Sequence, residues 1–290
     1  MAACALAWLA WQWPHAPLRA GVGFVLIVMG YSVFLAIEFV ALRFVDTEGA
    51  VPRPGWDELA RAWLGETVAA AVVFGWRQPF RWRAVSDQLE TGPGLPPRRG
   101  VVLIHGFVCN RGFWTPWLQE LRRRGHPFVA VNLEPVFGSI DEYAAVIDEA
   151  VERIARSTGM APVLVCHSMG GLAARAWLQA KSADSRVHHV ITIGSPHHGT
   201  WLGRFSRVAN GRQMRLDSRW LRRLGEPTAV RQFTCWYSNC DNIVFPAVTA
   251  TLAGADNRLV LGAAHVALAF HPRVMAQSLA LIAGEGPSAG

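Results

Sequence analysis

Six short apolar runs, each separated from the next by a stretch of another character, constrain the fold of this chain more than any other feature. They are rich in Val and Ile and have the length of strands that are buried on both faces of a parallel sheet. The runs cover residues 101–106, 128–133, 162–168, 187–195, 233–238 and 257–262. Helical patterns cover residues 113–124, 139–156, 170–181 and 272–283. Strands that alternate with helices predict a doubly wound α/β sheet with right-handed crossovers.

The third run ends in the sequence Cys166-His167-Ser168-Met169-Gly170-Gly171, directly before a helical pattern. A serine on a sharp strand-to-helix turn is exposed at the carboxyl edge of the sheet, close to backbone N–H groups. The residues two before and two after such a serine must be small. Gly170 meets this requirement, and Cys166 stands where glycine is usual. The turn predicts that Ser168 is a nucleophile.

A base and an acid for this nucleophile must come from loops at the same edge, in the chain order Ser, Asp, His. His265 follows the last strand and precedes the last helix, which is the required loop. Asp241 follows the preceding strand, and the apolar residues 244–246 would shield its carboxylate from water. Asp256 is the alternative acid, but it stands at the start of the last strand, at the opposite edge of the sheet. These positions favour Asp241 as the acid.

Five motifs occur in the order seen in bacterial α/β-hydrolase lipases and esterases of the triacylglycerol-lipase-like group, which the chain resembles over about residues 98–285. They are HGF (105–107), HSMGG (167–171), SPHHGT (195–200), DNIVFP (241–246) and GAAHVAL (262–268). The resemblance implies that Ser168 is the nucleophile, His265 the base and Asp241 the acid. It also implies that the backbone N–H groups of Phe107 and Met169 form the oxyanion hole. Such a site is complete in protein atoms, so we expect no cofactor.

Residues 201–231 occupy the place where these folds insert a cap, and so short a segment forms only a small one. Its arginines could contact anionic phospholipid or bind an acidic substrate. The alternative is that they belong to a solvated, arginine-rich helix pair. Trp114 and Trp117, near the oxyanion loop, are candidates for an apolar acyl-binding wall, with core packing as the alternative. His197 is a further candidate substrate-binding residue, with structural support of its loop as the alternative. Adjacent histidines such as His197 and His198 point apart, so we expect no metal site.

Residues 20–42 are apolar except for Glu38. At a rise of 1.5 Å per residue, this stretch is long enough to cross a hydrocarbon core of about 30 Å. It predicts a transmembrane helix, with a buried core helix as the alternative, and the Glu38 carboxylate is expected to reach the membrane interface. Upstream, residues 5–13 carry three tryptophans and form either a short first span or an in-plane segment. A start without basic residues favours a retained anchor over a cleaved signal peptide.

The sequence therefore divides into a membrane anchor (1–45), a linker with an interfacial or domain-packing helix (46–100) and a catalytic domain (101–290). The hydrophobic content of 51% and the mean hydropathy of +0.20 agree with contact to lipid. The net charge of +7 comes from scattered arginines, which does not indicate a nucleic-acid partner. We expect the protein in a bacterial inner membrane, although the charges around the span do not decide which side carries the catalytic domain.

The cysteines show no metal-type spacing. Cys235 and Cys240 would bridge in an oxidising compartment, or they are small buried residues.

Together these features predict a membrane-anchored serine hydrolase that cleaves carboxylic esters of hydrophobic acyl chains, with a lipid or another hydrophobic ester as substrate. An acyltransferase or a thioesterase on the same triad is the first alternative. A non-catalytic scaffold on the hydrolase fold is the second, and the presence of all three triad residues in order argues against it.

Overall fold

The structure, a computed structural model, describes residues 2–45, 51–91, 94 and 96–284. Its centre is a six-stranded sheet, and every neighbouring pair of strands in it is parallel. The strands are Val101–Ile104 (β1), Phe128–Ala130 (β2), Val163–His167 (β3), His189–Ile193 (β4), Phe233–Ser238 (β5) and Asp256–Val260 (β6). All six lie within the predicted runs or overlap them closely. The predicted α/β class with a parallel sheet is confirmed.

The strand order β2-β1-β3-β4-β5-β6 determines where a ligand is expected. From β1 the chain moves outward to β2 and then crosses back to place β3 on the other side of β1. A crevice opens at such a reversal, outside the carboxyl ends of the strands. The predicted nucleophile turn follows β3, and the predicted oxyanion loop follows β1, so both lie at this reversal.

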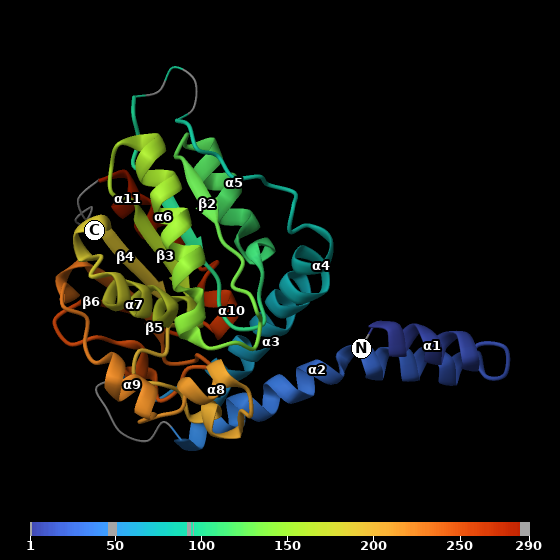
Figure 1. Cartoon of the computed structure of the whole chain (residues 1–290). Helices are drawn as coiled ribbons and strands as arrows, with labels where there is room; N and C mark the ends of the chain where they lie inside the picture. The colour runs from blue at the N-terminus through green and yellow to red at the C-terminus, as the bar shows by residue number, and fades with distance from the viewer. Residues whose placement is uncertain (1, 46–50, 92–93, 95, 285–290) are drawn as a thin grey trace.

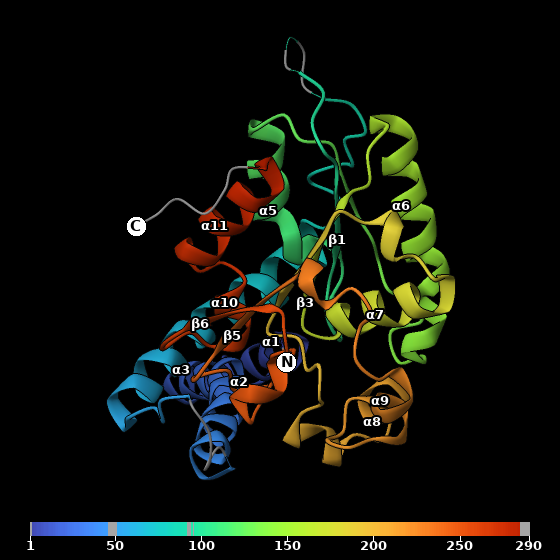
Figure 2. The same ribbon diagram turned by 90° about the vertical axis from the view of Figure 1, so that its left-hand side faces the viewer.

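Helices cover both faces of the sheet, with α6 and α7 on one side and α5 and α11 on the other (Figures 1 and 2). The helices and short turns around the sheet are η2 (Arg111–Trp114), α5 (Thr115–Arg123), η3 (Ile140–Tyr143), α6 (Ala144–Thr158), α7 (Met169–Lys181), η4 (Asp184–Arg186), η7 (Ala247–Ala250), α10 (His265–Leu268) and α11 (Pro272–Ala283). A capping box formed by Ser139 and Glu142 opens η3, which continues into α6 within the predicted helical pattern at 139–156. Gly159 ends α6 with φ 68°, in the left-handed region that glycine adopts without strain.

The N-terminal helices extend from this core. They are α1 (Ala2–Gln12), α2 (Pro17–Val45), α3 (Trp56–Val72), the π-helical turn η1 (Val73–Arg77) and α4 (Gln78–Phe80). The first half of α2 lies beside α1, away from the sheet, while its second half passes along the part of the chain that contains the sheet (Figure 1). In that second half Phe39 and Leu42 are buried together with Leu59 and Ala62 of α3 and Phe245. The structure therefore packs the predicted anchor against the sheet domain.

Two helical stretches in the described residues are long and apolar enough to cross a membrane, Pro17–Val45 and His265–Ala283. The second comprises α10 and α11, whose Val274, Leu279 and Ile282 are buried in the core on one face of the sheet. The first exposes apolar side chains along most of its length. Residues 46–50, 92, 93 and 95 of the predicted linker lie outside the described residues.

The predicted cap forms four short helical segments between β4 and β5. They are η5 (Trp201–Phe205), α8 (Ala209–Gln213), α9 (Arg219–Leu224) and η6 (Val230–Gln232). Trp220 donates its indole N–H to Asp141, and Asn210 donates to the carbonyl of Val136 at 2.8 Å. These bonds attach the segment to the loop that follows β2 and to the start of η3.

Candidate active site

Ser168 stands on a sharp turn between β3 and α7. Its backbone has φ 55° and ψ −128°, a conformation that is strained for any residue except glycine. The turn forces close approaches: a Cβ atom at Gly170 would lie 2.3 Å from the carbonyl oxygen of Ile104, and one at Gly106 would lie 2.7 Å from the Cβ of Ser168. Cys166, in place of the usual glycine, is fully buried in the core. The strained backbone and the glycine requirement are the features expected of a nucleophile turn.

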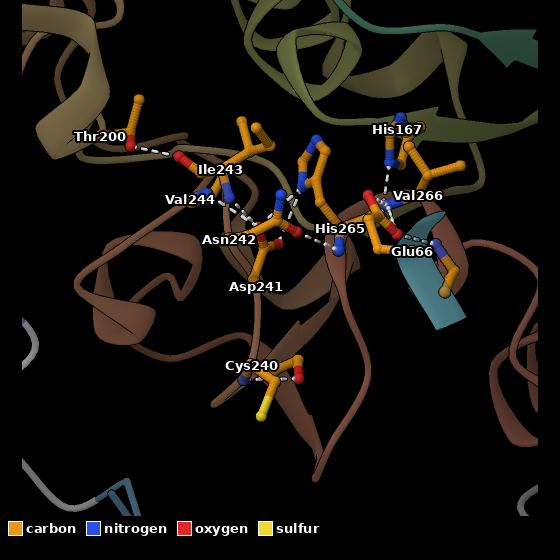
Figure 3. A network of polar contacts seen from close by, with 12 residues as sticks. Glu66, His167, Thr200, Cys240, Asp241, Asn242, Ile243, Val244, His265 and Val266 are labelled. Atoms are coloured by element: carbon orange, nitrogen blue, oxygen red, sulfur yellow. Dashed lines mark hydrogen bonds and ion pairs between the residues drawn. The ribbon is translucent and has the colours of Figure 1, made fainter. Parts of the chain in front are cut away.

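Asp241 and His265 meet at the same edge of the sheet (Figure 3). The Nδ1 atom of His265 lies 2.9 Å from each carboxylate oxygen of Asp241. The backbone N–H groups of Ile243 and Val244 donate to Oδ1 of the same carboxylate at 3.0 and 2.8 Å. Gly194, after β4, leaves room for the pair, because a Cβ atom there would lie 2.9 Å from Oδ2 of Asp241. An acid held in this way fixes the orientation of the imidazole.

Burial alone would lower the pKa of His265, because it penalises the charged imidazolium. The Asp241 carboxylate, its hydrogen bond to the ring and the charge of Glu66 outweigh burial, so the pKa of His265 lies above its ordinary value. A basic imidazole is suited to accept a proton from a hydroxyl group.

Asp256, the alternative acid, is the first residue of β6 and therefore lies at the other edge of the sheet. Its exposed carboxylate pairs with Arg258 at 2.7 Å and accepts a hydrogen bond from Thr234. The structure brings Asp241 to His265 and leaves Asp256 elsewhere.

Ser168 and His265 line one cavity of about 220 Å³. Phe107, in the predicted oxyanion loop, lines it too, beside the strained Val108 with φ 56°. Met169 is the first residue of α7, so its N–H is among those that have no acceptor within the helix. The remaining lining residues include four from the N-terminal helices and the turn after them, namely Leu35, Glu66, Ala70 and Phe74. In the part of the chain that the structure describes, no group of three or more His, Cys, Asp or Glu residues could hold a metal ion.

Comparison with known proteins agrees with this geometry. Residues 101–281 match the family model described as the alpha/beta hydrolase family. The chain belongs to this family. No curated protein sequence matches it. Among solved structures, the mature form of a lipase from Bacillus licheniformis is similar with a TM-score of 0.57 at 15% identity, over 67% of this chain and 95% of that lipase.

Lipase B from Aspergillus fumigatus is also similar, with a TM-score of 0.57 at 18% identity over 72% of this chain. The match covers 58% of the length of that lipase. At these identities the likeness shows that the lipases share the fold.

Two buried carboxylates of the N-terminal helices reach the loops that carry Asp241 and His265. Glu66 of α3 accepts the backbone N–H of Val266 at 2.8 and 3.1 Å and that of Ala267 at 3.0 Å, at the start of α10 (Figure 3). Burial raises the pKa of Glu66 to about 6, although these N–H groups favour its charged form. Glu66 thereby fixes the backbone that immediately follows the histidine.

The second of these carboxylates, Glu38 of α2, accepts a hydrogen bond from the side-chain amide of Asn242 at 2.7 Å. Asn242 is fully buried, and its Oδ1 accepts the backbone N–H of His265 at 3.2 Å. The expectation that Glu38 reaches the membrane interface is wrong: its carboxylate is buried against the hydrolase domain. The reason is that the second half of α2 packs against α3 and the loop after β5, and Asn242 offers a donor there.

The two tryptophans expected as an acyl-binding wall lie elsewhere. Trp114 and Trp117 are fully buried in the core between α5 and the sheet, with ring centroids 5.8 Å apart. The indole of Trp117 donates to the carbonyl of Ala269 at 2.8 Å. Neither is among the residues that line the cavity around Ser168. Core packing explains both, because η2 and α5 turn their apolar side inward onto the strands.

His197 supports its own loop and is not among the residues that line the cavity. Its ring lies between Arg175 and Thr192, with Nε2 3.0 Å from the Thr192 hydroxyl, and Arg175 donates to its carbonyl at 2.9 Å. His198 points away toward Glu226. Cys235 and Cys240, for which a bridge was one alternative, are both free and buried.

Sequence reasoning did not identify Glu66, Asn242 and Gly194 as parts of this site, and it assigned Glu38 to the wrong environment. One signal was present for Glu38, which is the one acidic residue of a strongly apolar helix, whereas the helix of Glu66 also carries Asp57 and Glu58. A buried carboxylate in such a helix requires a donor. For Gly194 and Asn242 the sequence contains no distinguishing pattern, because their roles depend on which loops meet.

Proposed function

We propose that this α/β hydrolase is a membrane-anchored serine hydrolase that cleaves carboxylic esters of hydrophobic acyl chains. One observation carries the proposal: Ser168, on its strained turn, lines the same apolar cavity as His265, and the His265 imidazole is paired with the buried Asp241. Serine acyl transfer needs this arrangement of nucleophile, base and orienting acid.

In the proposed reaction, Nε2 of His265 takes the hydroxyl proton of Ser168 as Oγ bonds to the ester carbonyl carbon. Asp241 stabilises the imidazolium through its Nδ1–H. The backbone N–H groups of Phe107 and Met169 receive the negative charge of the carbonyl oxygen. One such donor is typically worth about 3 kcal/mol in the transition state. His265 then gives its proton to the leaving alkoxide, the alcohol departs, and water resolves the acyl-enzyme by the same steps.

Membrane anchoring is proposed through α1 and α2, and a bacterial inner membrane remains the predicted location. The exposed apolar side chains of α2, among them Leu18, Leu26, Phe34 and Phe44, support a lipid environment. The contact between Glu38 and Asn242 supports a retained helix rather than a cleaved signal sequence. Extraction of the full chain from membranes by detergent, and not by high salt or carbonate, would agree with an integral anchor.

Labelling with a fluorophosphonate probe tests the catalytic proposal. We expect the full-length protein to be labelled at Ser168, and Ser168→Ala to lose the label together with hydrolysis of p-nitrophenyl esters, by about 10⁶-fold for a triad nucleophile. Folded wild-type protein that takes up no probe would refute the assignment. Persistent labelling of Ser168→Ala would transfer the role to another residue.

A further inference from the structure

The cavity at Ser168 has two chemically different sides. One side carries the proposed reacting groups, Ser168 and His265, with backbone from Gly106 and Phe107. The facing side is made by Leu35 of α2, Ala70 of α3 and Phe74 of η1. These three residues come from the N-terminal helices, which precede the family match at 101–281. This side of the cavity is therefore built by a segment outside the family match.

Leu35, Ala70 and Phe74 offer a ligand hydrocarbon contact only. Glu66 of α3 also lines the cavity, and both of its carboxylate oxygens accept backbone N–H groups, those of Val266 and Ala267. No further donor is needed to satisfy it, and an anionic substrate group would be repelled by its charge. The cavity volume of about 220 Å³ is below the roughly 300–1,000 Å³ of sites that enclose a whole drug-sized ligand. A cavity of this size and lining suits part of one unbranched alkyl chain.

The mouth of this cavity lies on an exposed apolar surface. Phe74 and Val108 line the cavity and are nevertheless 44% and 48% exposed. The same N-terminal segment carries further exposed apolar side chains, namely Val33 and Phe34 on α2, Val68 and Val72 on α3, and Trp76 and Phe80 beyond it. Exposed apolar side chains on α3 and η1, together with the membrane-length apolar stretch of α2, support contact with lipid.

Resting on the proposed ester hydrolysis, we propose that α2, α3 and η1 form the acyl-chain subsite, and that its ligand is a single fatty-acyl chain of a lipid ester that enters from the bilayer. Leu35 and Ala70 then limit the depth available to the chain, and Phe74 with Val108 forms its entrance. The N-terminal helices thus select the substrate in addition to holding the protein at the membrane.

Filling the cavity tests the subsite. Ala70→Phe and, independently, Leu35→Trp place an aromatic ring in the space assigned to the chain. In the full-length protein we expect each to lower the ratio of p-nitrophenyl dodecanoate to p-nitrophenyl acetate hydrolysis by about tenfold or more, since apolar pocket contacts discriminate on this scale. Ala71→Phe and Ile37→Trp are the matched controls, because both positions are exposed on the same helices and do not line the cavity. The controls should leave the ratio unchanged.

An unchanged ratio in both cavity variants would overturn the subsite, and so would an equal fall in the control variants. Failure of the proposed function looks different: wild-type protein would then neither hydrolyse any of the esters nor take up the fluorophosphonate. The ratio uses residual activity, so partial loss of folded protein in one variant does not imitate the expected shift.

A second experiment tests whether the acyl chain of the substrate enters the cavity from the bilayer. Wild-type protein reconstituted in phosphatidylcholine vesicles is given a dodecanoyl ester embedded in the same vesicles, and detergent-solubilised protein is given that ester in micelles. Turnover in the vesicles that Phe74→Asp lowers relative to acetate hydrolysis would support entry from the bilayer. Turnover in micelles alone, with none in vesicles, would overturn the bilayer route.

Discussion

The two sides of the active site are made by different means. The catalytic side consists of loops that directly follow β1, β3, β5 and β6, so strand order alone brings Ser168, Asp241 and His265 to one edge. The opposite side is made by α2 and α3, far earlier in the chain, and it depends on tertiary packing and on two buried carboxylates. The difference indicates that α2 and α3 are structural parts of the candidate site, while the sheet positions the proposed catalytic residues.

The largest expected effect concerns the catalytic side. Asp241→Asn should lower kcat by about 10⁴-fold, the scale found when a triad acid becomes an amide and the imidazole loses its orientation. Asp256→Asn, at the start of β6 and at the opposite edge of the sheet, is the matched control and should stay within about twofold, because its exposed carboxylate contacts Arg258 and Thr234 and neither residue lines the cavity. Steady-state hydrolysis of a p-nitrophenyl ester measures both. Equal losses would remove Asp241 from its proposed role.

Glu66 should give the next largest effect, on the opposite side. Glu66→Ala leaves the N–H groups of Val266 and Ala267 buried without acceptors and frees the start of α10, so His265 loses its fixed position. A displacement of about 1 Å at a catalytic group costs about 100-fold, and we expect a fall in kcat of that order. Glu58→Ala, on the same helix, is a control that removes a contact to Asn239 away from the cavity. Wild-type kcat in Glu66→Ala would show that α3 serves as scaffold alone.

A smaller loss is expected for Glu38, which acts through Asn242. Glu38→Leu leaves a buried amide N–H unpaired, at a typical cost of about 1–3 kcal/mol in stability, and loosens the contact to the His265 backbone. We expect kcat to fall by about tenfold. Glu38→Gln keeps an acceptor for Asn242 and should restore most of the activity. Thermal unfolding measured beside kcat separates the two effects, and Glu38→Gln as inactive as Glu38→Leu would contradict the mechanism.

The smallest expected change is a displacement of the pH profile. His265 acts as a base when it is neutral, so kcat/KM rises with pH through its pKa. The negative charge of Glu66 raises that pKa, and Glu66→Gln removes the charge while keeping an acceptor oxygen. The acid limb of kcat/KM should therefore move to lower pH, and the effect of the charge appears above pH about 6, where Glu66 is ionised. A limb that stays in place, or moves to higher pH, would show that Glu66 does not act on His265 electrostatically.

The strands and the candidate triad were predictable because each depends on a short local pattern. A β-branched run, a small-x-Ser-x-Gly turn and a histidine between the last strand and the last helix each occupy a few consecutive residues. Parallel strands then place their carboxyl ends at one edge without further information. Asp241 could be preferred over Asp256 on the same ground.

The substrate wall could not be predicted in this way. An aromatic residue near the oxyanion loop looks alike whether it faces a cavity or the core, and Trp114 and Trp117 face the core because η2 and α5 pack inward. The role of Glu38 depends on Asn242, which lies more than two hundred positions later in the chain. Hydropathy identifies an apolar helix, but it does not identify which face of that helix meets protein and which meets lipid.

The hydrogen bond between Glu38 and Asn242 also bears on how this protein could be divided or re-engineered. Removing α1 and α2 to obtain a water-soluble enzyme would open the cavity to water on the Leu35 side. It would also leave the side-chain amide of Asn242, which contacts the His265 backbone, without its acceptor. Replacing the two helices with an unrelated membrane anchor would keep the protein at the membrane and lose the packing of α2 against the candidate site. If the proposed function holds, loss of α2 is therefore expected to lower the activity as well as to remove the membrane attachment.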